Sequence, residues 1–130
     1  MFETIRWRCH VHVGDRRGAG RVVGRMEKLL PCPLEITGYE RYWKFPELAE
    51  LQLVSPLASA TPEHALLTTL QRAWQIATPW SLLSSGASTH HEFNGIASAN
   101  SGASFSVPGV EWMEFTLTDR QEGTFMDVQV

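Results

Sequence analysis

The chain has few of the features that assign a function directly. Only two of its 130 residues are cysteines, Cys9 and Cys32, too few for a disulfide framework or a four-cysteine zinc module. We expect two reduced, partly buried thiols, with a single Cys9–Cys32 bridge as the alternative. No apolar run approaches the roughly 18 residues of a membrane span, and residues 1–13 lack the apolar core and cleavage site of a signal peptide. These absences favour a cytoplasmic protein without a membrane partner.

Motifs for catalysis and cofactor binding are also missing. No serine stands in a G-x-S-x-G setting, and there is no G-K-[ST] of a phosphate-binding loop. Gly18, Gly20 and Gly24 lie between a predicted strand and a predicted helix, but their spacing is one residue too long for the dinucleotide pattern G-x-G-x-x-G. The sequence therefore predicts no cofactor.

Charge is unevenly distributed along the chain. Residues 1–30 carry seven basic and three acidic side chains, a net charge of +4, whereas residues 31–130 carry four and eleven, a net charge of −7. The acidic remainder argues against a nucleic-acid partner, which would need a basic track for its phosphates. The two parts either neutralise each other across a sheet or leave an acidic surface that attracts a basic partner.

Hydrophobic periodicity predicts two helices and a series of strands. Strands are predicted at 4–13, 34–45, 48–55, 80–83, 90–97, 110–118 and 126–130, and helices at 22–30 and 62–77. A change of phase at Gly38 predicts a bulge in the second strand. Thr61 and Pro62 are typical of an N-cap and a first helical position. The apolar stripe of the second helix predicts that Trp74 faces the core.

The order of these elements predicts an α+β fold in one domain spanning residues 1–130. The first six elements match the ferredoxin-like βαββαβ motif, so we expect an antiparallel sheet with two helices packed on one face, plus extra C-terminal strands. A different α+β arrangement with a longer meander is the alternative. The segment 85–109 is rich in serine and glycine, and we expect its tip at 98–104 to be the most mobile part of the fold.

The histidines offer the best arrangement for metal binding or catalysis. His10 and His12 share the polar face of the first strand, where two imidazoles can converge on one metal ion, and His90 and His91 could add ligands. No carboxylate at ligand spacing accompanies them, so we predict no metal site. Alternatively, His10, His12 and His91 could serve acid–base catalysis in a small hydrolase or nuclease-like enzyme.

Aromatic and acidic residues favour a binding surface over an active site. Tryptophan and tyrosine are enriched at interface hot spots, and Trp112 lies opposite the apolar face of its predicted strand, among acidic neighbours. The residues predicted to bind a partner are Glu40, Trp43, His91, Asn94, Glu111, Trp112 and Glu114.

In size, acidity and α+β class, the whole chain resembles the small cytosolic immunity proteins that bacteria make against their own toxins. The resemblance implies a non-catalytic protein that binds and neutralises a cognate toxin, with a basic toxin domain as its protein partner. No residue is carried over, because the similarity lies in size, charge and class. A ligand-binding or dimerising module of ferredoxin-like type is a further alternative, and we expect a monomer or a homodimer.

Overall fold

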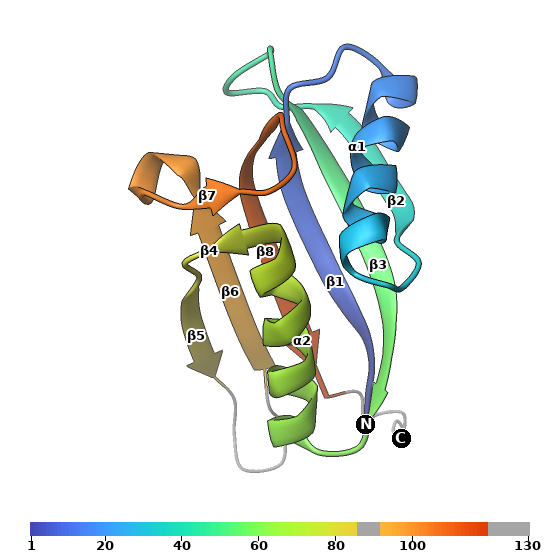
Figure 1. Ribbon diagram of the computed structural model, residues 1–130, viewed down its shortest axis with the longest axis vertical. Helices are drawn as coiled ribbons and strands as arrows, with labels where there is room; N and C mark the ends of the chain where they lie inside the picture. Colours follow the sequence, from blue (N-terminus) through green and yellow to red (C-terminus); the bar gives the residue numbers. More distant parts are fainter. Residues whose placement is uncertain (86–91, 120–130) are drawn as a thin grey trace, which may run out of the picture.

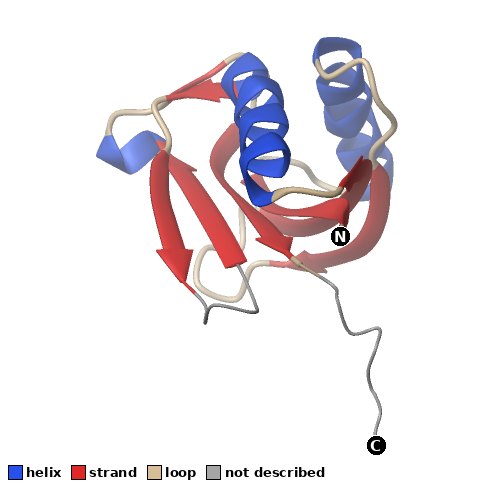
Figure 2. Ribbon diagram, turned by 90° about the horizontal axis from the view of Figure 1, so that it is seen from below, coloured by secondary structure: helices blue, strands red, loops and turns tan. Residues whose placement is uncertain are grey.

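The structure is a computed structural model, which describes residues 1–85 and 92–119. In this part of the chain, one six-stranded sheet forms the body of the fold and two α-helices pack on the same face of it (Figure 1, Figure 2). The sheet contains β1 (Phe2–Val11), β2 (Glu35–Arg41), β3 (Ala49–Ser59), β5 (Ser81–Ser85), β6 (Glu92–Ser98) and β8 (Val110–Thr118), and the helices are α1 (Arg16–Leu29) and α2 (Pro62–Ile76). The predicted α+β class is confirmed.

The strand order is β2-β3-β1-β8-β6-β5, and all neighbouring strands are antiparallel. The ferredoxin-like prediction is not confirmed in this form, because β8, and not a strand that directly follows α2, lies beside β1. The additional strands precede β8 in the sequence instead of following it. The strand predicted at 126–130 lies outside the described residues.

The small-residue segment 85–109 contains regular structure. Over its described residues, β6 confirms the strand predicted at 90–97, and a 3-10 turn, η1 (Ala99–Ser101), follows it. The chain then forms β7 (Ser104–Phe105), which pairs with β4 (Ala77–Thr78) in a separate two-stranded sheet. Strands of two residues have no periodicity, so the sequence analysis did not predict them. The mobility expected for the tip of this segment stays a prediction.

The core lies between the helices and the inner face of the sheet. Alternate residues of β1 and β8 point into it, as their sequences predict, and the buried ones are Ile5, Trp7, Cys9, Val11, Val110, Met113, Phe115 and Leu117. The rings of Trp7 and Phe115 meet edge to face, with centroids 5.9 Å apart, and Trp80 packs against both. Removing such side chains from water is the main source of stability for the fold, at roughly 25 cal/mol per Å² of apolar surface.

The start of α2 is confirmed, but its buried face is rotated from the one predicted. The Thr61 hydroxyl accepts a hydrogen bond from the His64 amide, and Pro62 occupies the first turn. The residues that α2 buries are Ala65, Thr69, Ala73 and Ile76. Trp74 is therefore 57% exposed, and its predicted place in the core is wrong. Neither described helix is both long and apolar enough to cross a membrane.

The first helix begins earlier than its hydrophobic pattern predicts. The Asp15 carboxylate accepts a hydrogen bond from the Gly18 amide at 2.8 Å, so α1 starts at Arg16 instead of Val22. A Cβ at Gly18 would lie only 3.2 Å from the Cβ of Val13. Glycine therefore allows close packing here, and the N-cap with this packing outweighs the low helix propensity of the glycine-rich sequence.

Candidate functional site

A row of polar and aromatic side chains crosses the open face of the sheet, the face away from the helices. The strand registers align one residue from each of five adjacent strands: Glu40, Glu50, His10, Trp112 and Ser98. All five line a groove of about 770 Å³. The turn between β2 and β3 adds aromatic residues to its wall, namely Tyr42, Trp43 and Phe45. We call this feature the open-face groove.

Rings stack in line along the open-face groove. His10 lies between Tyr42 and Trp112, with ring centroids 4.1 and 4.6 Å away and interplanar angles of 24° and 22°. Arg8 extends the line, because its guanidinium carbon lies 5.2 Å from the Trp112 ring, within the range of a cation–π contact. The two rings therefore hold the imidazole in a fixed orientation.

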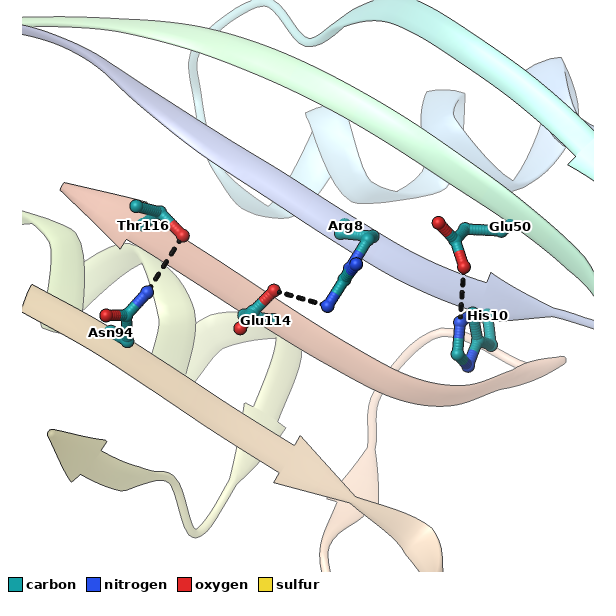
Figure 3. A network of polar contacts seen from close by, with 6 residues as sticks. All are labelled: Arg8, His10, Glu50, Asn94, Glu114 and Thr116. Atoms are coloured by element: carbon teal, nitrogen blue, oxygen red, sulfur yellow. Dashed lines mark hydrogen bonds and ion pairs between the residues drawn. The ribbon is translucent and has the colours of Figure 1, made fainter. Parts of the chain in front are cut away.

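Three basic side chains at β1 each contact a carboxylate of a strand beside it. Arg8 and His10 lie on β1, and His12 lies just after its end; Glu50 belongs to β3, and Glu111 and Glu114 belong to β8. The pairs and their N···O distances are Arg8–Glu114 (3.0 Å), His10–Glu50 (3.0 Å) and His12–Glu111 (3.3 Å). Figure 3 shows the first two pairs on the open face, with β1 between the strands that supply the carboxylates. These contacts occupy Glu50, Glu111 and Glu114 before any partner arrives.

Two other carboxylates of the groove have no such contact. The side chains of Glu40 and Glu47 form no hydrogen bond or ion pair with any residue in the described part of the chain. Glu40 also lies directly opposite Glu50 in the β2–β3 ladder, where like charges are destabilising. The adjacent Arg41 does not relieve this pair, because its guanidinium donates to two backbone carbonyls and to the Tyr39 hydroxyl.

Trp43 is the most exposed large apolar side chain of the described residues, at 83%. Its ring lies edge-on to Tyr42, with centroids 6.1 Å apart, and Phe45 packs on the same tyrosine. These contacts hold the indole at the rim of the groove while most of its surface stays in water. An exposed tryptophan beside a groove is typical of a binding hot spot.

The structure brings together four of the seven residues predicted to bind a partner. Those at the open-face groove are Glu40, Trp43, Glu111 and Trp112. Glu114 lies further along β8 and is paired with Arg8. Asn94 lies further still from the groove, where its amide donates to the Thr116 hydroxyl at 3.0 Å (Figure 3). His91 lies outside the described residues.

Two residues that shape the groove, Glu50 and Tyr42, are not evident as site residues from the sequence. Glu50 lies on the polar face of β3, but its position beside His10 depends on the register between β1 and β3. Tyr42 directly follows the last residue of β2, Arg41, and its stacking on His10 depends on how the turn after β2 folds, which no local pattern indicates. The bulge predicted at Gly38 is confirmed by a shift of register between β2 and β3.

In the groove, His10 and His12 pair with carboxylates and do not converge on a common point where a metal ion could bind. His10 and His12 each contact their own carboxylate. Among residues 1–85 and 92–119, no three His, Cys, Asp or Glu side chains gather closely enough to hold a metal ion. His90 and His91, the other ligands considered, lie outside these ranges.

Neither cysteine is placed to act as a nucleophile of the groove. Both are free thiols. Cys9 points into the core, where burial raises the pKa of its thiol to about 12, with a further contribution from the charge of Glu50. Burial also raises the thiol pKa of Cys32, which lies just after α1. Because the thiolate is the reactive form, a raised pKa lowers the reactivity of both groups, and most of all that of the fully buried Cys9.

Comparison with protein-family models, with curated proteins and with solved structures finds no match for this chain. Its function therefore has to be argued from the groove. Aromatic faces and carboxylates together attract a cation, and imidazole–carboxylate pairs can exchange protons. The groove can thus bind a basic group or support acid–base chemistry.

Proposed function

We propose that this protein is a non-catalytic protein-binding protein, an immunity-type inhibitor that uses the open-face groove to bind a basic surface of a cognate toxin. The observation that carries the proposal is the exposed Trp43 beside carboxylates, Glu40 and Glu47, that have no cationic partner among the described residues. The groove is lined by four carboxylates, Glu40, Glu47, Glu50 and Glu111, and by two permanent cations, Arg8 and Lys44. A lysine or arginine of the partner would offset this excess negative charge, which also steers association.

The Glu40–Glu50 pair is the part of the groove that a basic partner would change most. The two residues face each other across the ladder, and among the described residues Glu50 contacts His10 whereas the Glu40 side chain has no hydrogen bond or ion pair. A cation between them replaces a repulsion with two attractions, which strengthen as the partner excludes water. Local rules of stability are commonly violated at functional sites, and this like-charge pair is such a violation.

Truncating Trp43 tests the proposal. The first step is to look for a toxin gene beside the gene for this protein, and its absence would count against the proposal. The toxin domain found there, purified in an inactive form, is the probe and is titrated calorimetrically. Trp43→Ala should weaken binding by about 2 kcal/mol or more, roughly 30-fold, because the interface loses its most exposed ring. Trp112 is a less suitable target, because it also stacks on His10 and its loss would disturb the groove.

Trp74→Ala is the matched control for this variant. Trp74 is also an exposed tryptophan, but it lies on α2, on the helix side of the sheet. Its truncation should leave the affinity unchanged. The proposed interface is refuted if the Trp43 and Trp74 variants bind the toxin domain equally well.

Neutralising Glu40 gives a second, independent signature. Glu40→Gln should weaken toxin binding and reduce its dependence on salt, yet slightly stabilise the free protein, because it removes the repulsion with Glu50. Glu35→Gln, on the same strand but outside the groove, should change neither property. Destabilisation of the free protein by Glu40→Gln would show that this carboxylate has a structural role instead.

The two imidazole–carboxylate pairs favour a second candidate, a small hydrolase or nuclease-like enzyme. His10–Glu50 and His12–Glu111 are arrangements used in general acid–base catalysis. The excess of carboxylates in the groove disfavours a phosphate-bearing substrate. Cleavage of RNA homopolymers or nitrophenyl esters by the purified protein, lost in the double variant His10→Ala/His12→Ala, would support this candidate. Turnover that survives in that variant would exclude it.

We also propose that the fold elaborates the ferredoxin-like order. If β8 is taken as the fourth strand of the motif, the strand order β2-β3-β1-β8 is that of a ferredoxin-like sheet. The helices also fit, because α1 follows β1 and α2 follows β3 in the chain. The strands β4 to β7 would then be an insertion between α2 and β8. Deleting residues 77–109, which contain β4 to β7, and joining α2 directly to β8 would test this topology, because the remaining core should still fold.

A further inference from the structure

The strand β5 forms one edge of the sheet in the described part of the chain. It is last in the strand order, and β6 is its only partner among the described strands (Figure 1). Its sequence, Ser-Leu-Leu-Ser-Ser, contains no charged residue and no proline. Leu82 and Leu83 are 50% and 69% exposed. An edge strand of this kind presents unpaired backbone groups and apolar side chains to another strand.

The opposite edge of the same sheet, β2, is protected. It carries the charged residues Glu35, Glu40 and Arg41, and a register shift at Gly38 interrupts its pairing with β3. Charges and bulges on edge strands are devices that prevent sheets from joining. Because β5 has neither, the described part of the chain protects only one of the two edges of its sheet.

The apolar surface at β5 extends to both faces of the sheet. Leu83 lies opposite Asn94, and Ser81 lies opposite Ile96, so Leu83 and Ile96 share the open face. Leu82 lies opposite Gly95 and therefore points to the helix face. An added strand would gain a leucine contact on each face as well as the hydrogen bonds of the ladder.

We propose that β5 pairs with β5 of a second copy of the chain, antiparallel about a two-fold axis, so that two six-stranded sheets become one. A two-fold interface requires the same surface on both partners, and a neutral strand meets its own copy without repulsion between like charges. If Leu83 of one copy lies opposite Leu83 of the other, the open faces of the two sheets lie on the same side of the joined sheet. The two leucines then form an apolar pair at the two-fold axis. This inference does not depend on the proposed function.

The size of the contact predicts a weak dimer. A strand of five residues is about 17 Å long, so its pairing buries much less than the roughly 800 Å² per partner of a standard interface. Association should therefore appear only at high protein concentration. The groove reaches β6 only at Ser98, beyond the part of β6 that pairs with β5, and its other strand residues lie on β8, β1, β3 and β2, so both grooves should stay open in the dimer.

Sedimentation velocity over about 10 µM to about 1 mM tests the dimer, because weak interfaces dissociate in this range. The wild-type protein should shift from monomer to dimer, and Leu83→Glu should stay monomeric because two charges would meet at the axis. Leu67→Glu is the matched control, a leucine 58% exposed on α2, and should dimerise as the wild type does. A wild-type monomer at about 1 mM, or a dimer that Leu83→Glu does not dissociate, overturns the proposal.

Hydrogen exchange supplies a readout that does not depend on a charged substitution. Backbone amides of residues 81–84 should exchange more slowly in concentrated than in dilute wild-type samples. The variant Leu83→Ser, which removes the side chain without adding charge, should weaken this effect, and circular dichroism checks that both variants fold. Equal exchange at the two concentrations would also overturn the proposal.

Discussion

A methyl group added at Gly95 is the most direct test of how the sheet is packed. Gly95 on β6 lies opposite Phe115 on β8, and a Cβ at Gly95 would fall 2.2 Å from Cε2 and 2.5 Å from Cζ of that ring. The ring cannot easily move aside. It is fully buried, and its centroid lies 5.9 and 5.4 Å from those of Trp7 and Trp80.

The expected cost of Gly95→Ala follows from this geometry. Overpacking a core costs about 1–3 kcal/mol, and the confinement of Phe115 by two indoles places this case near about 3 kcal/mol. With an unfolding entropy of about 2.1 cal/mol/K per residue, 1 kcal/mol corresponds to about 4 °C in a chain of this length. The thermal midpoint should therefore fall by about 10 °C.

Urea unfolding followed by circular dichroism measures this change. Gly24→Ala in α1 is the control: a Cβ there meets nothing within 4 Å, so replacing a helical glycine should stabilise the protein by about 0.5–1 kcal/mol. Combining Gly95→Ala with Phe115→Leu should cost less than the sum of the single changes, because the smaller side chain relieves the clash. Wild-type stability of the Gly95 variant, or additive costs in the double variant, would refute this account of the packing.

Two further predictions concern buried groups. Ser55→Ala should destabilise the protein by about 1–3 kcal/mol, because the buried Trp7 indole N–H donates to the Ser55 hydroxyl at 3.0 Å and would lose its acceptor. The exposed Thr37→Ala is the control and should change the stability by less than about 0.5 kcal/mol. A change as small as this in the Ser55 variant would contradict the prediction. Iodoacetamide at pH 8 should modify Cys32 while sparing Cys9, because a pKa of about 12 leaves about one Cys9 thiol in ten thousand ionised. In urea both should react, and mass spectrometry counts the modified sites; labelling of Cys9 in the folded protein would contradict its burial.

The elements that sequence reasoning identified are those whose pattern is local. The alternation of β1 and β8 predicts which side chains are buried, and Thr61 with Pro62 marks the start of α2, because each signal lies within a few neighbouring residues. The start of α1 is not evident from the apolar pattern because the glycines near its start lower the helix propensity there, although the Asp15 N-cap is itself a local signal. The position of Trp74 was missed because packing on the sheet decides which side of α2 faces inward.

The candidate site was predictable only in its residue types. Glu40, Trp43, Glu111 and Trp112 were found because acidic and aromatic residues in polar positions stand out in a sequence. Their arrangement around His10 depends on the order and register of the strands, which join residues about 40 and 100 positions away in the chain. A single sequence contains no signal for such pairings.

The two-sided character of β1 limits how this protein can evolve. One side of the strand supplies Trp7 and Cys9 to the interior, and the other supplies Arg8 and His10 to the floor of the groove. A slip of one residue would expose the first pair and bury the second. The floor is thus inherited together with the fold, whereas the exposed turn at 43–47 can change without disturbing the core. Sequence diversity among descendants should therefore be concentrated at that rim.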